Sequence, residues 1–532
     1  MPFPILPLIY GVQMSESEKQ RKTKEGDLSE DSLTEKPQIK GEVLDSYFFN
    51  SESIPVNVKI TRERSDFVPS YNLFIPGLGE GTRLVLNTLK AELVTEVKLS
   101  VSEMLDTKKA EEVKAKFIAK ALTILSKNFP NLSESTKMVL ASYLIQNTLG
   151  LGDLEALMHD NQLEEVAINN SHDSVWAYHK KYGWCKTNIY IRSENSIYDY
   201  SSMIGRKIGK QINTLNPLMD AHLPSGERVN ATLFPVSNMG NTITIRKFSQ
   251  NPWTISRFVE SGCIPAEVAG LVWLCVQNEM SLIVAGGTGS GKTSFLNAIA
   301  TLIPASQRII SIEDTRELTL PSFMHWVPMV TKEPNAEGKG EITMLDLLVN
   351  SLRQRPDRIL IGEVRKQREA QVMFEAMHTG HSVYATIHAD NSQETISRLT
   401  NPPIDIPKQM LDSLSGIIVQ FRQRRLNLRR TFEFSEITQS GDANTLWRLD
   451  VKADRMISSG RMSRLAEKLS LYSGLTQKEI DADVKQKAEI IGWMAKQKHT
   501  DVNVVGGIVS RYYQTPGEIT ELAAKGKPWR EG

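Results

Sequence analysis

The stretch LIVAGGTGSGKTSFLNAIATL, residues 282–302, decides the fold of this chain. Its apolar start, 282–285, predicts a buried strand, and its end carries apolar residues at helical spacing. Between them lies G-x-x-x-x-G-K-T, in the strand–loop–helix context that makes this pattern a phosphate site. Glycines let backbone N–H groups face phosphate oxygens, and the helix N-terminus adds partial positive charge. The alternative, a glycine-rich turn without a ligand, is disfavoured by this context.

We therefore expect residues 286–293, called the phosphate loop below, to bind ATP with Mg²⁺. Lys292 can reach the β- and γ-phosphates, and the Thr293 hydroxyl can ligate the metal. The expected nucleotide-binding residues are Gly286, Gly287, Thr288, Gly289, Ser290, Gly291, Lys292, Thr293 and Ser294.

Length and composition indicate a multidomain globular protein. At 532 residues the chain is too long for one ordinary core, and its net charge of +1 points to neither nucleic acid nor membrane. The cysteines Cys185, Cys263 and Cys275 form no C-x-x-C pair, so neither a disulfide framework nor a cysteine zinc site is expected, which fits a reducing compartment. No apolar run approaches the ~20 residues needed to span a bilayer.

Changes in periodicity predict an α/β chain of several parts. Strands alternate with helices through 281–400, which favours a parallel, wound sheet. The stretch from Met14 to about Ser46 is polar, charge-dense and without aromatic residues, a composition typical of disorder, and we expect translation to start at Met14. The expected parts are a disordered segment (1–46), a helical subdomain (47–150), a mixed α/β domain (151–250), the nucleotide-binding domain (254–455) and a C-terminal helical subdomain (456–532).

Two further segments place carboxylates at the carboxyl ends of apolar strands, where open α/β sheets carry their chemistry. RIISIED, residues 308–314, ends in two acids, of which Glu313 can orient a water molecule; a helix-capping acid is the alternative. RILIGEVR, residues 358–365, resembles a Walker B strand with one departure. Gly362 occupies the usual acidic position, and the acid is Glu363, which can still reach the metal. Its alternative is a surface glutamate after a core strand.

A third segment, TGHSVYATIHAD at 379–390, carries Thr386 and His388 two residues apart on one strand face. Such a pair can sense the γ-phosphate or relay its loss. Zinc binding by His378, His381 and His388 is the competing interpretation. It is disfavoured because His381 and His388 are seven residues apart and no cysteine lies nearby. We expect His378 to pack under the sheet instead.

Taken together, these segments resemble the type II/type IV secretion ATPase superfamily, the motors of pili, secretion systems and conjugation. The resemblance covers roughly residues 150–440 and is strongest for the archaeal branch, meaning the archaellum motor ATPase and related pilus ATPases. The four-cysteine insertion common in bacterial pilus-extension ATPases is missing. The matching segments are the phosphate loop, the Asp box (312–318), the Walker B-like strand, the His box (385–389), and the upstream stretches 163–169, 223–230 and 243–248.

This resemblance implies a RecA-like P-loop NTPase domain with a separate α/β N-terminal domain, assembled as a homo-hexamer with nucleotide between the lobes. It implies a peripheral position at the cytoplasmic face of the membrane, against a polytopic platform protein. The resemblance implies phosphate and Mg²⁺ binding for Lys292 and Thr293, and water activation for Glu313. It gives Glu363 the Walker B function with metal binding, and His388 the sensing of nucleotide. It also implies that Arg228 and Arg246 contact phosphate. Each arginine could instead be a surface residue, and the sequence does not decide between them.

One dense basic run, FRQRRLNLRR at 421–430, lies between apolar stretches and predicts a hairpin. A solvated turn is favoured for it, then a contact to anionic headgroups or to an acidic loop of a membrane partner. Nucleic acid comes third, because no aromatic residues suited to base stacking are interleaved.

The expected function is an ATP-hydrolysing motor for an archaellum or archaeal pilus. The alternatives are a pilus or type II secretion ATPase, a DNA-translocating conjugation ATPase, and a nucleotide-binding scaffold without hydrolysis. The scaffold is disfavoured by the joint presence of Lys292, Glu313 and Glu363.

Overall fold

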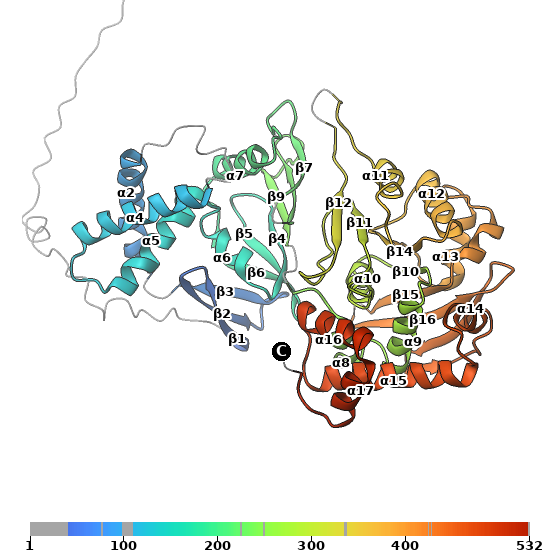
Figure 1. Cartoon of the computed structure of the whole chain (residues 1–532). Coiled ribbons are helices and arrows are strands. Elements are labelled where there is room, and N and C mark those ends of the chain that lie inside the picture. The colour runs from blue at the N-terminus through green and yellow to red at the C-terminus, as the bar shows by residue number, and fades with distance from the viewer. Residues whose placement is uncertain are drawn as a thin grey trace, which may run out of the picture. The chain divides into compact units, whose positions relative to one another are not determined.

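The computed structural model describes residues 41–75, 78–97, 110–223, 226–247, 251–334, 338–423, 425–426 and 428–529. These fall into two compact units, with the border between Tyr200 and Ser201 (Figure 1). The proposed start at Met14 lies outside the described residues, as do residues 224, 225 and 248 of the quoted motifs.

The first unit contains a mixed sheet and a group of helices. Its strands follow the order β1-β2-β3-β6-β5-β4. The alternation of the fully buried Ile54, Val56, Val58 and Ile60 with more exposed residues explains β2, because successive side chains of a strand point to opposite faces. The strands are β1 (Glu42–Ser51), β2 (Ile54–Arg62), β3 (Ser70–Phe74), β4 (Leu163–Ile168), β5 (Ser174–His179) and β6 (Gly183–Tyr190); the helices are α2 (Glu80–Glu96), α4 (Ala110–Asn128), α5 (Glu134–Leu149) and α6 (Leu154–His159).

The N-terminal expectations need correction in two places. Strand β1 begins at Glu42, so the disorder expected for 1–46 is wrong at its end, and residues 1–40 lie outside the described part of the chain. The helical subdomain expected over 47–150 also holds half of β1 as well as β2 and β3, and the last two fall where short β-like runs are expected, within 54–76. The expected domain borders near 150 and 250 stay predictions; helix α7 (Glu194–Lys207) runs across the border between the compact units.

The second unit begins with three antiparallel strands, β7 (Leu218–His222), β8 (Arg228–Thr232) and β9 (Thr242–Arg246). Helices α8 (Ile255–Glu260) and α9 (Ala266–Gln277) then lead into the nucleotide-binding sheet.

The large sheet has the order β12-β11-β13-β14-β10-β15-β16-β17-β18 and is parallel from β12 to β15, which confirms the expected α/β fold. The predicted hairpin is β15–β16, which pair antiparallel. The strands are β10 (Leu282–Gly286), β11 (Ile309–Glu313), β12 (Trp326–Val330), β13 (Arg358–Ile361), β14 (Ser382–Ile387), β15 (Gly416–Gln423), β16 (Leu428–Ile437), β17 (Ala443–Asp450) and β18 (Arg455–Ser458). The helices are α10 (Lys292–Ala300), α11 (Met344–Ser351), α12 (Gln367–His378), α13 (Ser392–Thr400), a 3₁₀ turn (Lys408–Ser413), α14 (Arg464–Ser473), α15 (Gln477–Lys496), α16 (Val502–Gln514) and α17 (Pro516–Ala524).

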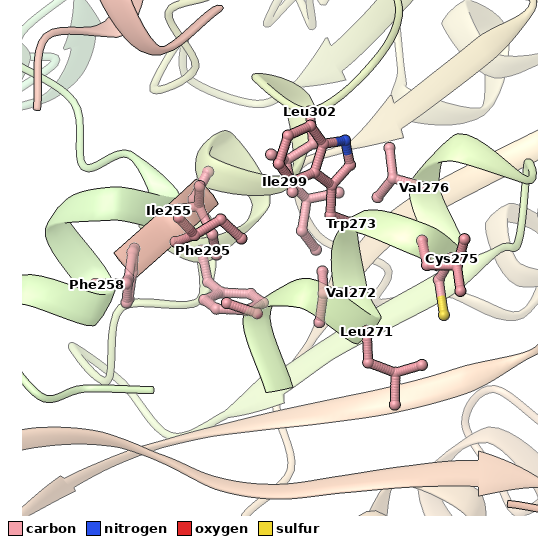
Figure 2. Packing of buried hydrophobic residues seen from close by; sticks show 14 of the residues in the cluster. Ile255, Phe258, Leu271, Val272, Trp273, Cys275, Val276, Phe295, Ile299 and Leu302 are labelled. Carbon is pink, nitrogen blue, oxygen red and sulfur yellow. The ribbon is translucent and has the colours of Figure 1, made fainter. Parts of the chain in front are cut away.

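Helix α10, which follows the phosphate loop, is anchored in an extensive hydrophobic core. Figure 2 shows Phe295 and Ile299 of this helix among side chains of α8 and α9, and the rings of Phe295 and Phe258 meet edge to face with centroids 5.1 Å apart. The indole of Trp273 on α9 donates a hydrogen bond to Tyr513 on α16 (2.9 Å). Helix α15 packs along α8 and α9 (Figure 1). The C-terminal helices thus complete the core that holds the start of α10 in place.

Among the described residues, no helix combines the length and the apolar character needed to cross a bilayer.

Candidate nucleotide-binding and catalytic site

The phosphate loop has the backbone that its glycines predict. Gly286 ends β10 with φ 152°, and a Cβ there would lie 2.4 Å from the carbonyl oxygen of Gln420 on β15. Gly289 and Gly291 take the left-handed φ values 71° and 98°, which only glycine adopts readily. Side chains at these positions would break either the strand pairing or the turn into α10. The loop is therefore built from backbone, as a phosphate cradle requires.

Two side chains of the loop fit a polyphosphate. Lys292 is 8% exposed and donates to the carbonyl oxygen of Gly287 (Nζ–O 3.1 Å), and burial lowers the pKa of its ammonium. The Ser290 hydroxyl is buried without a hydrogen-bond partner among the described residues. A buried cation and an unsatisfied hydroxyl at a helix N-terminus favour an anionic ligand. Thr293 and Ser294 follow within the first turn of α10.

The structure links Lys292 to Glu363 through His388. The imidazole Nε2 lies 3.0 Å from Oε1 of Glu363, and Lys292 Nζ lies 3.4 Å from Nδ1. Burial, and then the charge of Lys292, lower the pKa of His388. A neutral ring with its proton on Nε2 can donate to Glu363, while the Lys292 ammonium lies beside the ring, 3.4 Å from Nδ1 and 3.5 Å from Nε2. The carboxyl ends of β10, β13 and β14 are thereby joined, as the sequence predicts for parallel neighbours.

Sequence reasoning assigned no role to Arg365, which binds both strand-end acids. Its guanidinium donates to Oε2 of Glu363 (2.9 and 2.5 Å) and to Oδ2 of Asp314 (2.8 Å). A cavity of about 190 Å³, lined by these three residues and by Lys332 and Glu333 among others, opens beside this contact. The only signal in the sequence is an arginine two residues after the acid, which is too common to be specific.

Glu313 differs from Glu363 because it points into the protein. Its side chain is 2% exposed, and Oε1 accepts the backbone N–H groups of Glu317 and Leu318 (2.9 and 3.1 Å). Oε2 has no hydrogen-bond partner among the described residues, and burial raises the pKa of the carboxyl to about 7. The departure at Gly362 has a packing reason, since a Cβ there would lie 3.3 Å from Cγ of Glu313.

The two arginines between which the sequence did not decide are direct cross-strand neighbours. Arg228 on β8 pairs in register with Arg246 on β9, and both are exposed. Arg228 donates to both carboxylate oxygens of Asp220 (3.1 and 2.5 Å). Like charges directly opposite on a sheet repel each other, and the carboxylate of Asp220 offsets this repulsion at Arg228.

The residues present are compatible with Mg²⁺, which keeps water and phosphate ligands and needs only one or two from the protein. Thr293 and Glu363 are the expected pair. Among the described residues, no three His, Cys, Asp or Glu side chains gather as a metal site. His378 is exposed at the end of α12, so the expectation that it packs under the sheet is wrong.

Comparisons with known proteins agree with the motifs. The family model "Type II/IV secretion system protein" matches residues 194–500, more than half of the chain. An uncharacterized protein of Methanocaldococcus jannaschii is 33% identical over 386 residues, covering 70% of this chain and 69% of that protein. The type IV secretion system protein PtlH of Bordetella pertussis is 30% identical over 294 residues, covering 49% of this chain and 86% of PtlH.

Among solved structures, the VirB11 ATPase from the Brucella suis type IV secretion system, in complex with sulphate, is 25% identical. The match covers 54% of this chain and 97% of that one, with a TM-score of 0.28. Because this TM-score is below 0.5, the family assignment rests on the sequence matches. The chain belongs to the type II/IV secretion system protein family.

Proposed function

We propose that this chain hydrolyses ATP to ADP and phosphate. The observation that carries the proposal is the hydrogen-bonded series from Lys292 through His388 to Glu363, which joins the phosphate loop to a strand-end carboxylate. A buried lysine at the start of α10 suits the terminal phosphates, and Mg²⁺ held by Thr293 and Glu363 would neutralise phosphate charge there.

Glu313 is the proposed water-orienting carboxylate. Its free oxygen and its pKa of about 7 suit a general base at neutral pH. Because Oε2 is buried, water reaches it in this proposal only after a local movement around Glu313. Glu363, whose oxygens accept hydrogen bonds from His388 and Arg365, is held in place as a metal ligand and is less suited to take a proton from water.

The experiment measures phosphate release from Mg²⁺-ATP by the purified chain, its Lys292→Ala variant and its Glu313→Gln variant. Lys292→Ala removes the cation aimed at the terminal phosphates and is expected to abolish release and weaken nucleotide binding. Glu313→Gln is expected to bind ATP normally and to lose 10²–10⁴-fold in rate, the usual contribution of a general base.

Two outcomes would contradict these assignments. If the wild-type chain released phosphate no faster than Lys292→Ala, it would be no ATPase. If Glu313→Gln turned over at the wild-type rate while Glu363→Gln did not, the base would be Glu363.

We further propose a hexameric motor at the cytoplasmic face of a membrane, acting with a polytopic platform protein to assemble or rotate an archaellum or an archaeal pilus. Family membership and the Methanocaldococcus relative support this proposal. Nucleotide held between lobes contributes binding energy only in the assembled geometry, so ATP shifts the equilibrium toward rings. Sedimentation with ATP and Mg²⁺ is expected to give a species of about six subunits; a fully active monomer at micromolar concentration would contradict the motor.

A second candidate, secretion or conjugation, is favoured by the match to PtlH of a type IV secretion system. Stimulation of hydrolysis by single- or double-stranded DNA would support a DNA-translocating ATPase over a filament motor. The filament motor predicts a rate that does not depend on DNA.

A further inference from the structure

The basic hairpin β15–β16 lies against the phosphate loop. Its arginines Arg422 and Arg429 are cross-strand partners, and both reach Gly289 in the middle of the loop. Arg429 Nε donates to the carbonyl oxygen of Gly289 at 3.1 Å. A Cβ on Gly289 would lie 2.8 Å from a guanidinium nitrogen of Arg422. The solvated turn favoured from the sequence is therefore wrong for this pair.

The other face of the hairpin has a different role. Arg430 donates to both carboxylate oxygens of Asp454 (2.9 and 2.8 Å), because side chains alternate between the two faces of a strand. Arg425 is exposed in the turn, whereas Arg424 and Asn427 lie outside the described residues. The run thus contains two arginines on the phosphate loop. Arg430 on the far face also donates to the backbone carbonyl oxygen of Arg429 (2.9 Å), so removing its side chain disturbs the hairpin while the guanidiniums on the loop stay in place.

We propose that Arg422 and Arg429 are positioning residues of the phosphate loop, holding it ready for the polyphosphate of a nucleoside di- or triphosphate. A carbonyl bonded on the outside of the loop fixes the peptide plane, so the neighbouring N–H groups stay directed toward the ligand. Gly289, at φ 71°, is a position where a loop without such a support has many conformations.

Charge adds to this effect. The two guanidiniums lie beside the loop that also carries the cation Lys292. Positive charge at the loop attracts a polyphosphate more strongly than a monophosphate, and salt screens the attraction. The hairpin arginines are therefore expected to matter more for ADP and ATP than for AMP, and more at low ionic strength.

The proposal rests on the proposed nucleotide site, and its test compares arginines on the two faces of one hairpin. The measured quantities are the Kd of a fluorescent ADP analogue, the KM and kcat for Mg²⁺-ATP, and the Tm without nucleotide. Arg429→Ala is expected to raise Kd and KM about tenfold, as for a lost hydrogen bond from a charged donor, with kcat changed far less. Arg429→Lys, which keeps charge and a donor, is expected to recover most of the affinity.

Arg430→Ala is the matched control and is expected to change Kd and KM less than about twofold, whatever it does to Tm. An equal loss of nucleotide affinity in Arg429→Ala and Arg430→Ala would overturn the proposal, because it would indicate a general effect of the hairpin on folding. Unchanged affinity in both Arg422→Ala and Arg429→Ala, in a chain whose Lys292→Ala variant no longer binds, would also overturn it. Absence of nucleotide binding by the wild-type chain would instead refute the ATPase assignment itself.

Discussion

The imidazole of His388 connects the side chains of Lys292 and Glu363: Nε2 is 3.0 Å from Oε1 of Glu363, and Nδ1 is 3.4 Å from Nζ of Lys292. The three residues come from the ends of β14, α10 and β13, which are far apart in the sequence. A lowered pKa keeps the ring neutral at physiological pH, so it can donate to Glu363 while the Lys292 ammonium lies close to both ring nitrogens. Loss of the terminal phosphate would allow Lys292 to move, and the contact through His388 would then change the position of the Glu363 carboxylate.

Replacing His388 by alanine is expected to lower kcat roughly 100-fold, the cost of an active-site group displaced by about an ångström. ADP affinity should change far less, because the phosphate loop itself stays intact. The control is His378→Ala, since His378 is exposed on α12. Steady-state kinetics of both variants test the link, and equal rates for His388→Ala and wild type would show that the ring does not connect the two strands.

Glu313 makes the free energy of unfolding depend on pH. Its folded pKa of about 7 lies above the ordinary glutamate value of 4.5, so between these pH values the folded chain keeps a proton that the unfolded chain has lost. Stability therefore falls as pH rises through this window, and the whole cost, about 3 kcal/mol, is present above pH 7. The glutamine in Glu313→Gln cannot ionise, so the stability of this variant does not carry this cost.

We expect the Tm of Glu313→Gln minus that of wild type to rise between pH 4.5 and 7 and then to level off. Thermal unfolding at a series of pH values measures this Tm difference, and Glu375→Gln on the exposed face of α12 is the control. A Tm difference that is flat with pH would mean that Glu313 titrates normally in the folded chain.

The bare Cα of Gly362 makes room for Glu313. A methyl group there would lie 3.3 Å from Cγ of Glu313, tight enough that the carboxylate has to move. Gly362→Ala is therefore expected to lower kcat at least tenfold while nucleotide affinity stays near wild type. The matched control is Gly492→Ala in α15, where a Cβ meets nothing within 4 Å and alanine favours the helix. Unchanged turnover in Gly362→Ala would separate the packing at Gly362 from catalysis.

The local part of the site was predictable, and the long-range part was not. The strand–loop–helix around Lys292 follows from spacing alone, because glycine, lysine and the apolar periods act within a dozen residues. The contact of Arg429 with Gly289 depends on β15 lying beside β10, and a sequence pattern does not state which strands are neighbours. The burial of His378 was wrongly predicted because the buried face of α12 was misplaced. Met373 and Met377 lie on that face, and the next residue, His378, points to solvent.

The arginine pair on β8 and β9 provides a test of the N-terminal part of the proposed motor. Arg228 and Arg246 oppose each other across two strands, and Asp220 engages only Arg228 in the contacts described above. In the proposed mechanism, one or both stabilise charge on the transferring phosphoryl group. Removing an arginine with that role costs about 10³-fold or more in rate. Neither residue belongs to the phosphate loop, so binding of Mg²⁺-ADP should survive the change.

Arg228→Ala and Arg246→Ala are therefore expected to lower kcat steeply while the Kd for Mg²⁺-ADP and the Tm stay nearly constant. Asp220→Asn separates two roles for Arg228, because it frees the guanidinium without removing it. If Arg228 is catalytic, the Asp220→Asn variant should keep its turnover. If the ion pair is only structural, Asp220→Asn and Arg228→Ala should lower the Tm by the same amount. Arg206→Ala, on the exposed face of α7, is the control for general charge loss. Wild-type turnover in both arginine variants would show that these strands take no part in hydrolysis.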